Sequence, residues 1–127
     1  MPRILLIDDD EMISTLLTDV LLAAGYEVTT ADSAFGGDTL VRKLQPAAVL
    51  LDIGLPFRPG TALLDELKSD PRTADVPVVV FSGMTETLNE ERRALAAAVL
   101  SKPIEIDELL AVLRRVCVER SPLEKPA

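Results

Sequence analysis

Six polar residues follow short apolar runs in this chain, and their types suit phosphoryl-group chemistry. They are Asp8, Asp9, Asp10, Asp52, Ser82 and Lys102. Carboxylates gathered at one place repel each other, because two unit charges about 4 Å apart cost on the order of 4 kcal/mol at an effective dielectric of about 20. Either one carboxyl group keeps its proton or a cation binds. Oxygen ligands without His or Cys suit a hard divalent ion, so the pattern predicts a Mg²⁺ site.

Asp52 is the predicted nucleophile of this set. The apolar residues 47–51 run directly into it. A carboxylate can attack phosphorus and form an acyl phosphate, whose oxygens then need positive charge and hydrogen-bond donors. Lys102 offers the charge and Ser82 a hydroxyl. Each residue alone also fits an ordinary structural role, so the prediction depends on the combination.

Those ordinary roles are specific. Residues 8–10 would cap the helix that follows them, where the helix dipole favours acids. Ser82 would be a turn former, and Lys102 a solvated loop residue. These readings stay open for each residue taken singly.

Composition excludes several functional classes. The chain has 127 residues and no His, which rules out Ser-His-Asp and Cys-His catalysis and His-based zinc sites. Its one Cys, Cys117, falls on an apolar helical face and is predicted to be a core residue. The net charge is -8 without a cluster of Lys or Arg, so no nucleic-acid partner is predicted.

The N-terminal apolar run is short and is followed directly by acids, unlike a signal peptide or a membrane span. We therefore expect no membrane partner and a cytoplasmic protein.

Apolar runs alternate with amphipathic stretches five times. Runs bounded by turn formers indicate buried parallel strands, which we predict at residues 3–7, 26–30, 47–52, 76–81 and 99–101. Helical spacing predicts helices at about residues 12–24, 34–44, 61–68, 86–97 and 107–119. Ser33 is the predicted N-cap of the second helix, which Gly36-Gly37 weakens. The inward residues of the last helix are predicted to be Leu109, Leu110, Val112, Leu113, Val116 and Cys117.

This alternation predicts one α/β domain, a doubly wound five-stranded parallel sheet with five helices and right-handed crossovers. If the strand order is 2-1-3-4-5, strands one and three are neighbours at the topological switch point. The six polar residues then converge at the carboxyl edge of the sheet, where open α/β folds bind ligands.

Four motifs in this order and spacing resemble the receiver domain of two-component response regulators, from residue 2 to about residue 118. They are ILLIDDD at 4–10, LLDIGLP at 50–56 with Gly60 following, VVVFSG at 78–83, and Lys102-Pro103. The resemblance implies a flavodoxin-like fold and a single CheY-like receiver of bacterial type over residues 1–118. Residues 119–127 are then a short tail, without an output domain.

The resemblance also implies a metal site. Asp9 would bind Mg²⁺ directly and Asp8 through water, with Asp52 and the backbone carbonyl of Gly54 as further ligands. Asp10 matches no role in the family.

Asp52 would accept a phosphoryl group from the phosphohistidine of a sensor histidine kinase or a histidine phosphotransfer protein. The resemblance implies that Ser82 and Lys102 then contact that group, with Lys102-Pro103 in the cis state. The signal would pass to an unknown downstream protein through protein–protein contacts.

Three positions depart from the family pattern. Its aromatic switch residue, three positions before the lysine, is Val99 here, so rotation of an aromatic ring cannot be the output signal, and residues 95–99 form a short connection. Ser82 replaces the commoner Thr. Met84 offers no polar group to orient a hydrolytic water, which predicts a long-lived acyl phosphate.

Two alternatives remain open. A degenerate receiver would bind partners without phosphorylation, and Val99 favours that reading. A small phosphatase or phosphotransferase would need a further acid or base and a cap over its substrate, and neither is evident near Asp52. The preferred prediction is a signalling domain, not an enzyme.

Overall fold

The computed structural model describes residues 2–33, 36–54, 60–82 and 88–119. Over these residues, five strands form one parallel sheet in the order β2-β1-β3-β4-β5, which confirms the predicted doubly wound architecture. The strands are β1 (Arg3–Ile7), β2 (Glu27–Ala31), β3 (Ala48–Asp52), β4 (Val78–Ser82) and β5 (Ala98–Ser101). The helices are α1 (Glu11–Ala23), α2 (Gly37–Leu44), α3 (Gly60–Ser69), α4 (Glu90–Leu95) and α5 (Ile106–Glu119).

Helices cover both faces of the sheet, and this explains why β1, β3 and β4 are apolar apart from one terminal residue each. All five residues of β3 are buried. In the register of the sheet, Ile7 pairs with Leu51 and Phe81 pairs with Asp52. The ends of β1, β3 and β4 therefore lie side by side, which is what the site requires.

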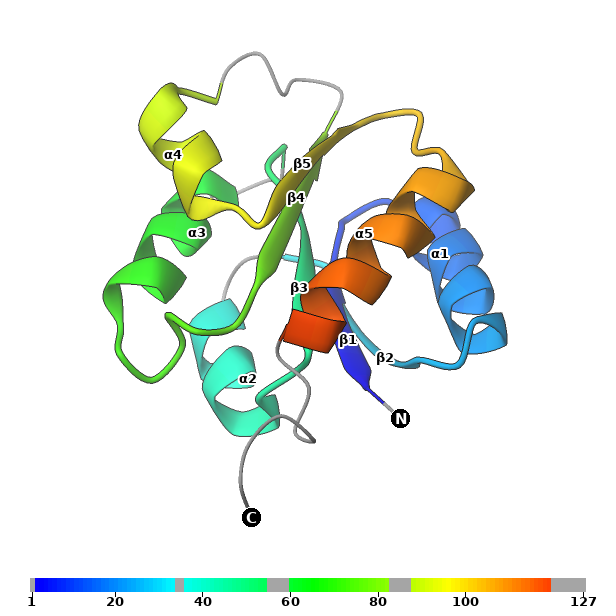
Figure 1. Cartoon of the computed structure of the whole chain (residues 1–127), viewed down its shortest axis with the longest axis horizontal. Coiled ribbons are helices and arrows are strands. Elements are labelled where there is room, and N and C mark those ends of the chain that lie inside the picture. Colours follow the sequence, from blue (N-terminus) through cyan, green and yellow to red (C-terminus); the bar gives the residue numbers. More distant parts are fainter. Residues whose placement is uncertain (1, 34–35, 55–59, 83–87, 120–127) are drawn as a thin grey trace.

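Two hydrophobic clusters lie on the two faces of the sheet. In Figure 1, α1 and α5 lie on one side of the strands, and α2 and α3 lie on the other. The first face buries Leu17 and Leu21 of α1 with four residues of α5, namely Leu109, Leu113, Val116 and Cys117. The second buries Val41 of α2 with Leu63, Leu64 and Leu67 of α3. The predicted core positions of Leu109, Leu113, Val116 and Cys117 in α5 are confirmed, whereas Leu110 and Val112 are only partly buried.

The predicted start of α2 is wrong. The helix begins at Gly37, and its N-cap is Gly36 in the left-handed region with φ 73°, not Ser33; residues 34 and 35 lie outside the described part of the chain. A Cβ on Gly37 would lie 2.7 Å from Leu63 Cδ2. The two glycines therefore mark the turn into α2 and its close contact with α3, where a side chain would not fit.

Helix α4 is shorter than predicted at both ends. Its N-cap is Asn89, whose side chain accepts a hydrogen bond from the Arg92 backbone N–H at 2.9 Å. Ala96 has extended backbone angles and ends the helix. The rest of the predicted N-terminal part, residues 86–87, falls in a segment that the structure leaves undescribed, as does the predicted tail from residue 120 onward.

Helix α1 has the predicted position but an unexpected exposed face. Met12 is 83% exposed and Leu16 is 57% exposed, although both follow the helical apolar spacing. Leu17 and Leu21 alone among the residues of α1 are fully buried.

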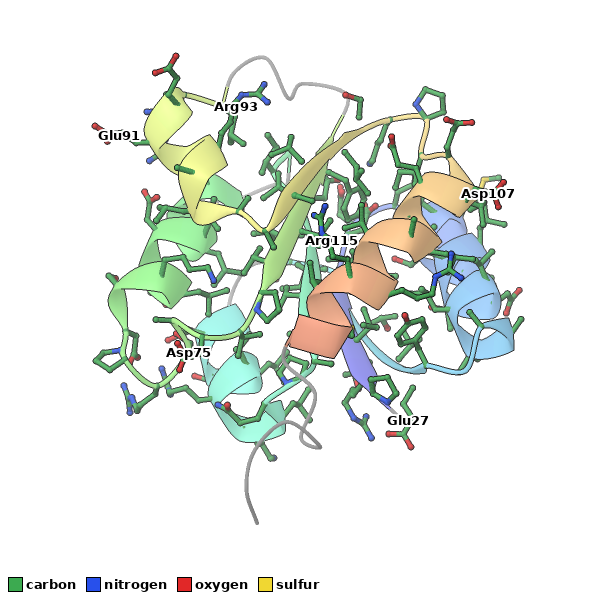
Figure 2. The ribbon with its side chains drawn as sticks, viewed as in Figure 1. Glu27, Asp75, Glu91, Arg93, Asp107 and Arg115 are labelled. Atoms are coloured by element: carbon green, nitrogen blue, oxygen red, sulfur yellow. The ribbon has the colours of Figure 1, made fainter. Side chains whose placement is uncertain are left out.

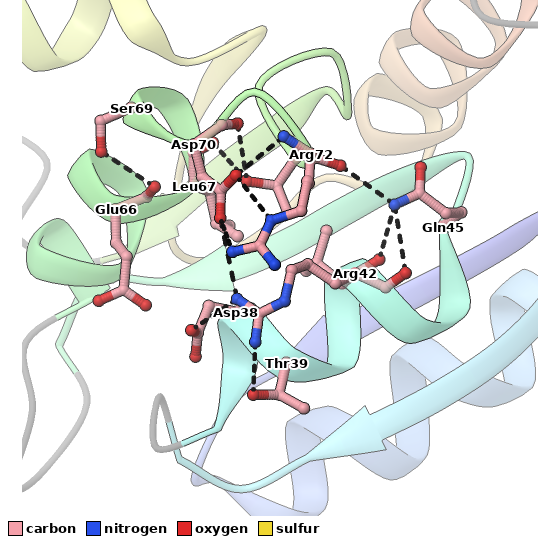
Figure 3. Close-up of polar contacts among 11 residues, drawn as sticks. Asp38, Thr39, Arg42, Gln45, Glu66, Leu67, Ser69, Asp70 and Arg72 are labelled. Atoms are coloured by element: carbon pink, nitrogen blue, oxygen red, sulfur yellow. Dashed lines mark hydrogen bonds and ion pairs between the residues drawn. The ribbon is translucent and has the colours of Figure 1, made fainter.

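Polar contacts tie the elements together at the amino edge of the sheet. Arg42 of α2 pairs with Asp38 at 3.1 Å and with Asp70 at 3.8 Å, and Asp70 also pairs with Arg72 (Figure 3). The Gln45 side chain donates to the Arg72 carbonyl oxygen at 3.2 Å. These residues form the amino-edge network, which joins the end of α2 to the turn between α3 and β4.

Arg115 of α5 is labelled in Figure 2. Its guanidinium group donates a hydrogen bond at 3.4 Å to the carbonyl oxygen of Ala97, which lies just before β5.

Candidate functional site

Three of the predicted acids meet at the carboxyl edge of the sheet. Asp8 directly follows β1, and Asp52 is the last residue of β3. Each of Asp8, Asp9 and Asp52 places a carboxylate oxygen within 4.8 Å of the others. Because β1 and β3 are neighbours at the switch point, residues 43 positions or more apart in the chain form one acidic cluster.

Lys102 reaches into this cluster from the end of β5. Its Nζ lies 3.1 Å from Asp52 Oδ2 and 3.5 Å from Asp8 Oδ2. The Lys102-Pro103 peptide bond is cis, as the resemblance implied. The site therefore contains one ammonium group between two buried carboxylates.

The Asp52 carboxylate is held at both oxygens. Oδ1 accepts a hydrogen bond from the Gly54 backbone N–H at 2.9 Å, and Oδ2 accepts one from Lys102. Gly60, the first residue of α3, approaches the end of β3 closely, because a Cβ on Gly60 would lie 2.5 Å from the Asp52 backbone oxygen. The glycine that follows the LLDIGLP motif is therefore required by close approach of α3 to the end of β3.

Asp8 is the most deeply buried acid of the cluster, with 2% of its surface exposed. Its Oδ1 accepts a hydrogen bond from the Asp10 backbone N–H at 2.9 Å, whereas its Oδ2 has no hydrogen-bond partner among the described residues. Burial is the main reason that the pKa of Asp8 is raised to about 6, and the nearby Asp52 charge raises it further.

A divalent cation fits this arrangement. The cluster offers only oxygen ligands, one of which is a buried oxygen without a hydrogen-bond partner, and hard cations such as Mg²⁺ prefer oxygen ligands. The unfavourable contacts among the carboxylates would become ligand contacts. The residues present thus fit the metal that the sequence predicts.

Asp10 has a different role from Asp8 and Asp9. It is the N-cap of α1, and its Oδ1 accepts hydrogen bonds from the backbone N–H groups of Met12 at 3.0 Å and Ile13 at 3.2 Å. The capping role is therefore confirmed for Asp10, while the metal-binding role of Asp8 and Asp9 stays a prediction. Asp9 is exposed beside the buried pair.

Ser82 is the last residue of β4, and its partner in the register with β5 is Ser101. The end of β4 is thus placed next to Asp52 by the sheet, while the contact expected of the Ser82 hydroxyl stays a prediction. Met84 and the Leu55-Pro56 pair lie outside the described residues.

Sequence reasoning missed one residue at the site. The Lys102 Nζ lies 5.3 Å from the centroid of the Phe81 ring. The apolar pattern of residues 76–81 predicts Phe81 only as the end of a strand. Its position directly before Ser82, in a strand neighbouring that of Asp52, could have indicated a place beside the site.

Comparison with known proteins identifies the family. Residues 4–114 match the family model of the response regulator receiver domain. The chain belongs to this family. This receiver domain is 38% identical, over 116 residues, to the DNA-binding dual master transcriptional regulator RpaA of a Synechocystis species, covering 90% of this chain and 48% of that protein. The chain thus spans about half the length of the curated relatives it matches.

Solved structures show the same fold as this receiver domain. A sensor protein from Polaromonas sp. JS666 has a TM-score of 0.86 and 31% identity, with 94% of this chain and 98% of that chain covered. The receiver domain of the sensor histidine kinase PA1611 from Pseudomonas aeruginosa PAO1, solved with a magnesium ion coordinated in its active site cleft, has a TM-score of 0.82. It is 24% identical, with 92% of this chain and 98% of that chain covered, so this likeness concerns the fold.

No helix in the described part of this receiver domain has the length and apolar character needed to cross a bilayer.

Proposed function

We propose that Asp52 accepts a phosphoryl group from the phosphohistidine of a sensor histidine kinase or a histidine phosphotransfer protein. The observation that carries the proposal is the contact of the Lys102 ammonium with the buried carboxylates of both Asp52 and Asp8, at 3.1 and 3.5 Å. A cation buried beside a strand-end carboxylate can stabilise the negative oxygens of an arriving phosphoryl group. The signal then passes to a downstream protein through protein–protein contacts.

In the transfer step, an Asp52 carboxylate oxygen forms a bond to phosphorus while the phosphorus–nitrogen bond of phosphohistidine breaks. The bonding electron pair stays on the imidazole nitrogen of the donor. Lys102 pairs with the phosphoryl oxygens, and we expect the Ser82 hydroxyl to donate a hydrogen bond to another of them. The Gly54 N–H keeps the carboxylate in a fixed orientation during the attack.

Asp8, Asp9, Asp52 and the backbone carbonyl of Gly54 are the proposed holders of Mg²⁺. When bound, Mg²⁺ supplies positive charge that offsets the charge of the carboxylate and phosphoryl oxygens. The Asp8 Oδ2, which is buried and has no hydrogen-bond partner among the described residues, supports this assignment.

Mass spectrometry of the intact protein tests the proposal. After incubation with Mg²⁺ and acetyl phosphate or phosphoramidate, we expect a gain of one phosphoryl group, and Asp52→Asn should abolish it. Asp10→Asn is the matched control, because Asn is an equally good N-cap and Asp10 serves only as a cap here. This variant should still be modified.

The same experiment separates the alternatives. A degenerate receiver gains no mass, and a phosphatase turns over added phosphomonoesters. Val99 is partly buried against the hydrophobic cluster that contains residues of α2 and α3. Because valine has no aromatic ring, the family's usual switch cannot operate at this position. We expect self-phosphotransfer and loss of the phosphoryl group to be the only reactions of the domain.

The lifetime of the phosphorylated state is a further proposal. Met84 carries no polar group to orient an attacking water, so we expect the acyl phosphate to be long-lived. A half-life of seconds at neutral pH with Mg²⁺ would contradict this expectation.

We also propose that residues 1–118 act as the receiver unit, in the cytoplasm, with proteins rather than nucleic acid as the direct partners of this segment. The net charge of -8 supports this choice of partner, because a phosphate backbone attracts a basic surface.

A further inference from the structure

We propose that Phe81 is a positioning residue for Lys102, and that its ring face holds the ammonium group in place beside Asp52. The inference rests on the proposed function, which it deepens by adding a residue that acts through the lysine. Its basis is the contact of the Lys102 Nζ with the Phe81 ring, 5.3 Å from the ring centroid.

The sheet places Phe81 between the two groups that it serves. Phe81 pairs with Asp52 of β3 on one side and with Leu100 of β5 on the other. Lys102 follows Leu100 by two residues. The Phe81 carbonyl oxygen also accepts a hydrogen bond at 3.4 Å from the Ile53 backbone N–H, directly after Asp52. The backbone of Phe81 is thus bonded to the strand of the nucleophile, and its ring contacts the lysine.

Packing in the core fixes the orientation of the Phe81 ring, whereas the Lys102 side chain can rotate about its single bonds. Phe81 is 1% exposed and packed in a hydrophobic cluster, so its orientation is set by the core. A lysine side chain has four rotatable bonds, and ordering it costs conformational entropy. Attraction of a cation to the face of an aromatic ring operates within about 6 Å of the centroid and strengthens where water is excluded. The Lys102 side chain is only 24% exposed.

The Phe81 ring can also hold Lys102 after Asp52 has been phosphorylated. On phosphorylation the attacking oxygen of Asp52 becomes part of an acyl phosphate, so the ion pair that holds Lys102 in the free domain is altered. The attraction of the ring for the ammonium does not depend on the ionisation of Asp52. Phe81 can therefore keep Lys102 at the site both before and after the transfer, where its donors meet the phosphoryl oxygens.

A purely packing role for Phe81 is the alternative, and graded fluorination distinguishes the two. Phenylalanine with one, two or three ring fluorines is incorporated at position 81, because fluorine weakens the negative ring face with little change in shape. The rate constant for phosphorylation by phosphoramidate at saturating Mg²⁺ is then measured. We expect it to fall stepwise along the series, by about 2- to 30-fold in total.

Val79→Ala is the matched control. Val79 lies on the same face of β4 and is fully buried, but it is two residues further from the site. This variant should unfold at a lower temperature and keep the wild-type rate. Equal rates along the fluorinated series would overturn the inference and leave the proposed function intact.

A second measurement needs no phosphorylation. In the NMR spectrum, the ε-methylene protons of Lys102 should show an upfield ring-current shift that Phe81→Leu removes. Unshifted protons in the wild type would overturn the inference. A wild-type protein that shows the ring-current shift but gains no phosphoryl group would refute the proposed function, and with it the role of Phe81 in transfer.

Discussion

At the scale of single residues, three consecutive aspartates have three different environments. Asp10 caps a helix, Asp9 is exposed, and Asp8 is buried with one oxygen lacking a hydrogen-bond partner among the described residues. Burial of a carboxylate is costly even with the Lys102 Nζ 3.5 Å away, so the charged form of Asp8 should destabilise the fold.

Replacing Asp8 by Asn should therefore stabilise the metal-free protein. Asn keeps an oxygen for the Asp10 backbone N–H and removes the charge. At pH 7 we expect the free energy of unfolding to rise by up to about 3 kcal/mol, measured by urea denaturation in the presence of EDTA.

The free energy of unfolding of Asp8→Asn should also depend less on pH than that of the wild type. The folded protein keeps the Asp8 proton up to a pKa of about 6, whereas the unfolded chain loses it near 3.8. Wild-type stability should therefore fall as pH rises between these two values, and Asp8→Asn should show a shallower slope. A variant with the same slope and the same stability as wild type would contradict this account of Asp8.

Gly60 is a second residue with a specific requirement. Gly60→Ala would push a methyl group to 2.5 Å from the Asp52 backbone oxygen. We expect a loss of roughly 1–3 kcal/mol in stability, typical of overpacking, together with slower phosphorylation because the end of β3 shifts. The midpoint of urea denaturation measures the first effect, and the intact mass over time measures the second. Thr61→Ala, one residue later, is the control and should leave the phosphorylation rate unchanged.

At the scale of elements, α4 is held differently from the other helices. None of its residues is buried. Arg92 instead donates to both carboxylate oxygens of Asp65 in α3, with the shortest contact at 2.7 Å. Figure 1 shows α4 beside α3, while Glu91 and Arg93 lie on α4 in Figure 2. A helix anchored mainly by polar contacts is the one best suited to move.

Asp65→Asn should loosen α4 without unfolding the domain. The pair is partly exposed, so its loss should cost at most about 1 kcal/mol of global stability. We expect faster amide hydrogen exchange in residues 90–95 and unchanged exchange in the central strands. Glu91→Gln, a charge change on the same helix, is the control. Unchanged exchange in α4 would show that the ion pair does not anchor it.

The elements also show where sequence reasoning succeeds and where it stops. Strands β1, β3 and β4 were predicted well, because a strand covered on both faces is apolar along nearly all of its length. The start of α2 was wrong because Gly36 and the contact of Gly37 with Leu63 are tertiary constraints, invisible in helical spacing. Once the strand order 2-1-3-4-5 is assumed, the topology predicts that Asp8, Asp52 and Lys102 lie together. The contact with Phe81 could not, because it depends on where a ring lies within the core.

At the scale of the whole molecule, the two hydrophobic clusters cover the two faces of the sheet. Cys117 belongs to the cluster on the α1 and α5 side, so its reactivity can be used to measure how closed that cluster is. It is 9% exposed, and burial raises the pKa of its thiol to about 11 from an ordinary value of 9.0. The thiolate is the reactive form, so the folded protein disfavours it.

Alkylation of Cys117 should therefore follow opening of the domain. At pH 8 we expect iodoacetamide to react with the native protein at least about 100-fold more slowly than with the urea-unfolded chain, because a pKa two units higher leaves that much less thiolate. Mass spectrometry over time gives both rates. Comparable rates would show that the α5 side of the core is open in the native state.

The amino-edge network and the acidic cluster lie at opposite edges of one parallel sheet. A fluorescent dye or an immobilisation tag attached at Arg72 would sit on the rim away from Asp52 and leave the carboxyl edge open to a kinase. The domain can thus be attached to a surface through its amino edge, while reagents in solution reach the acidic cluster at its carboxyl edge.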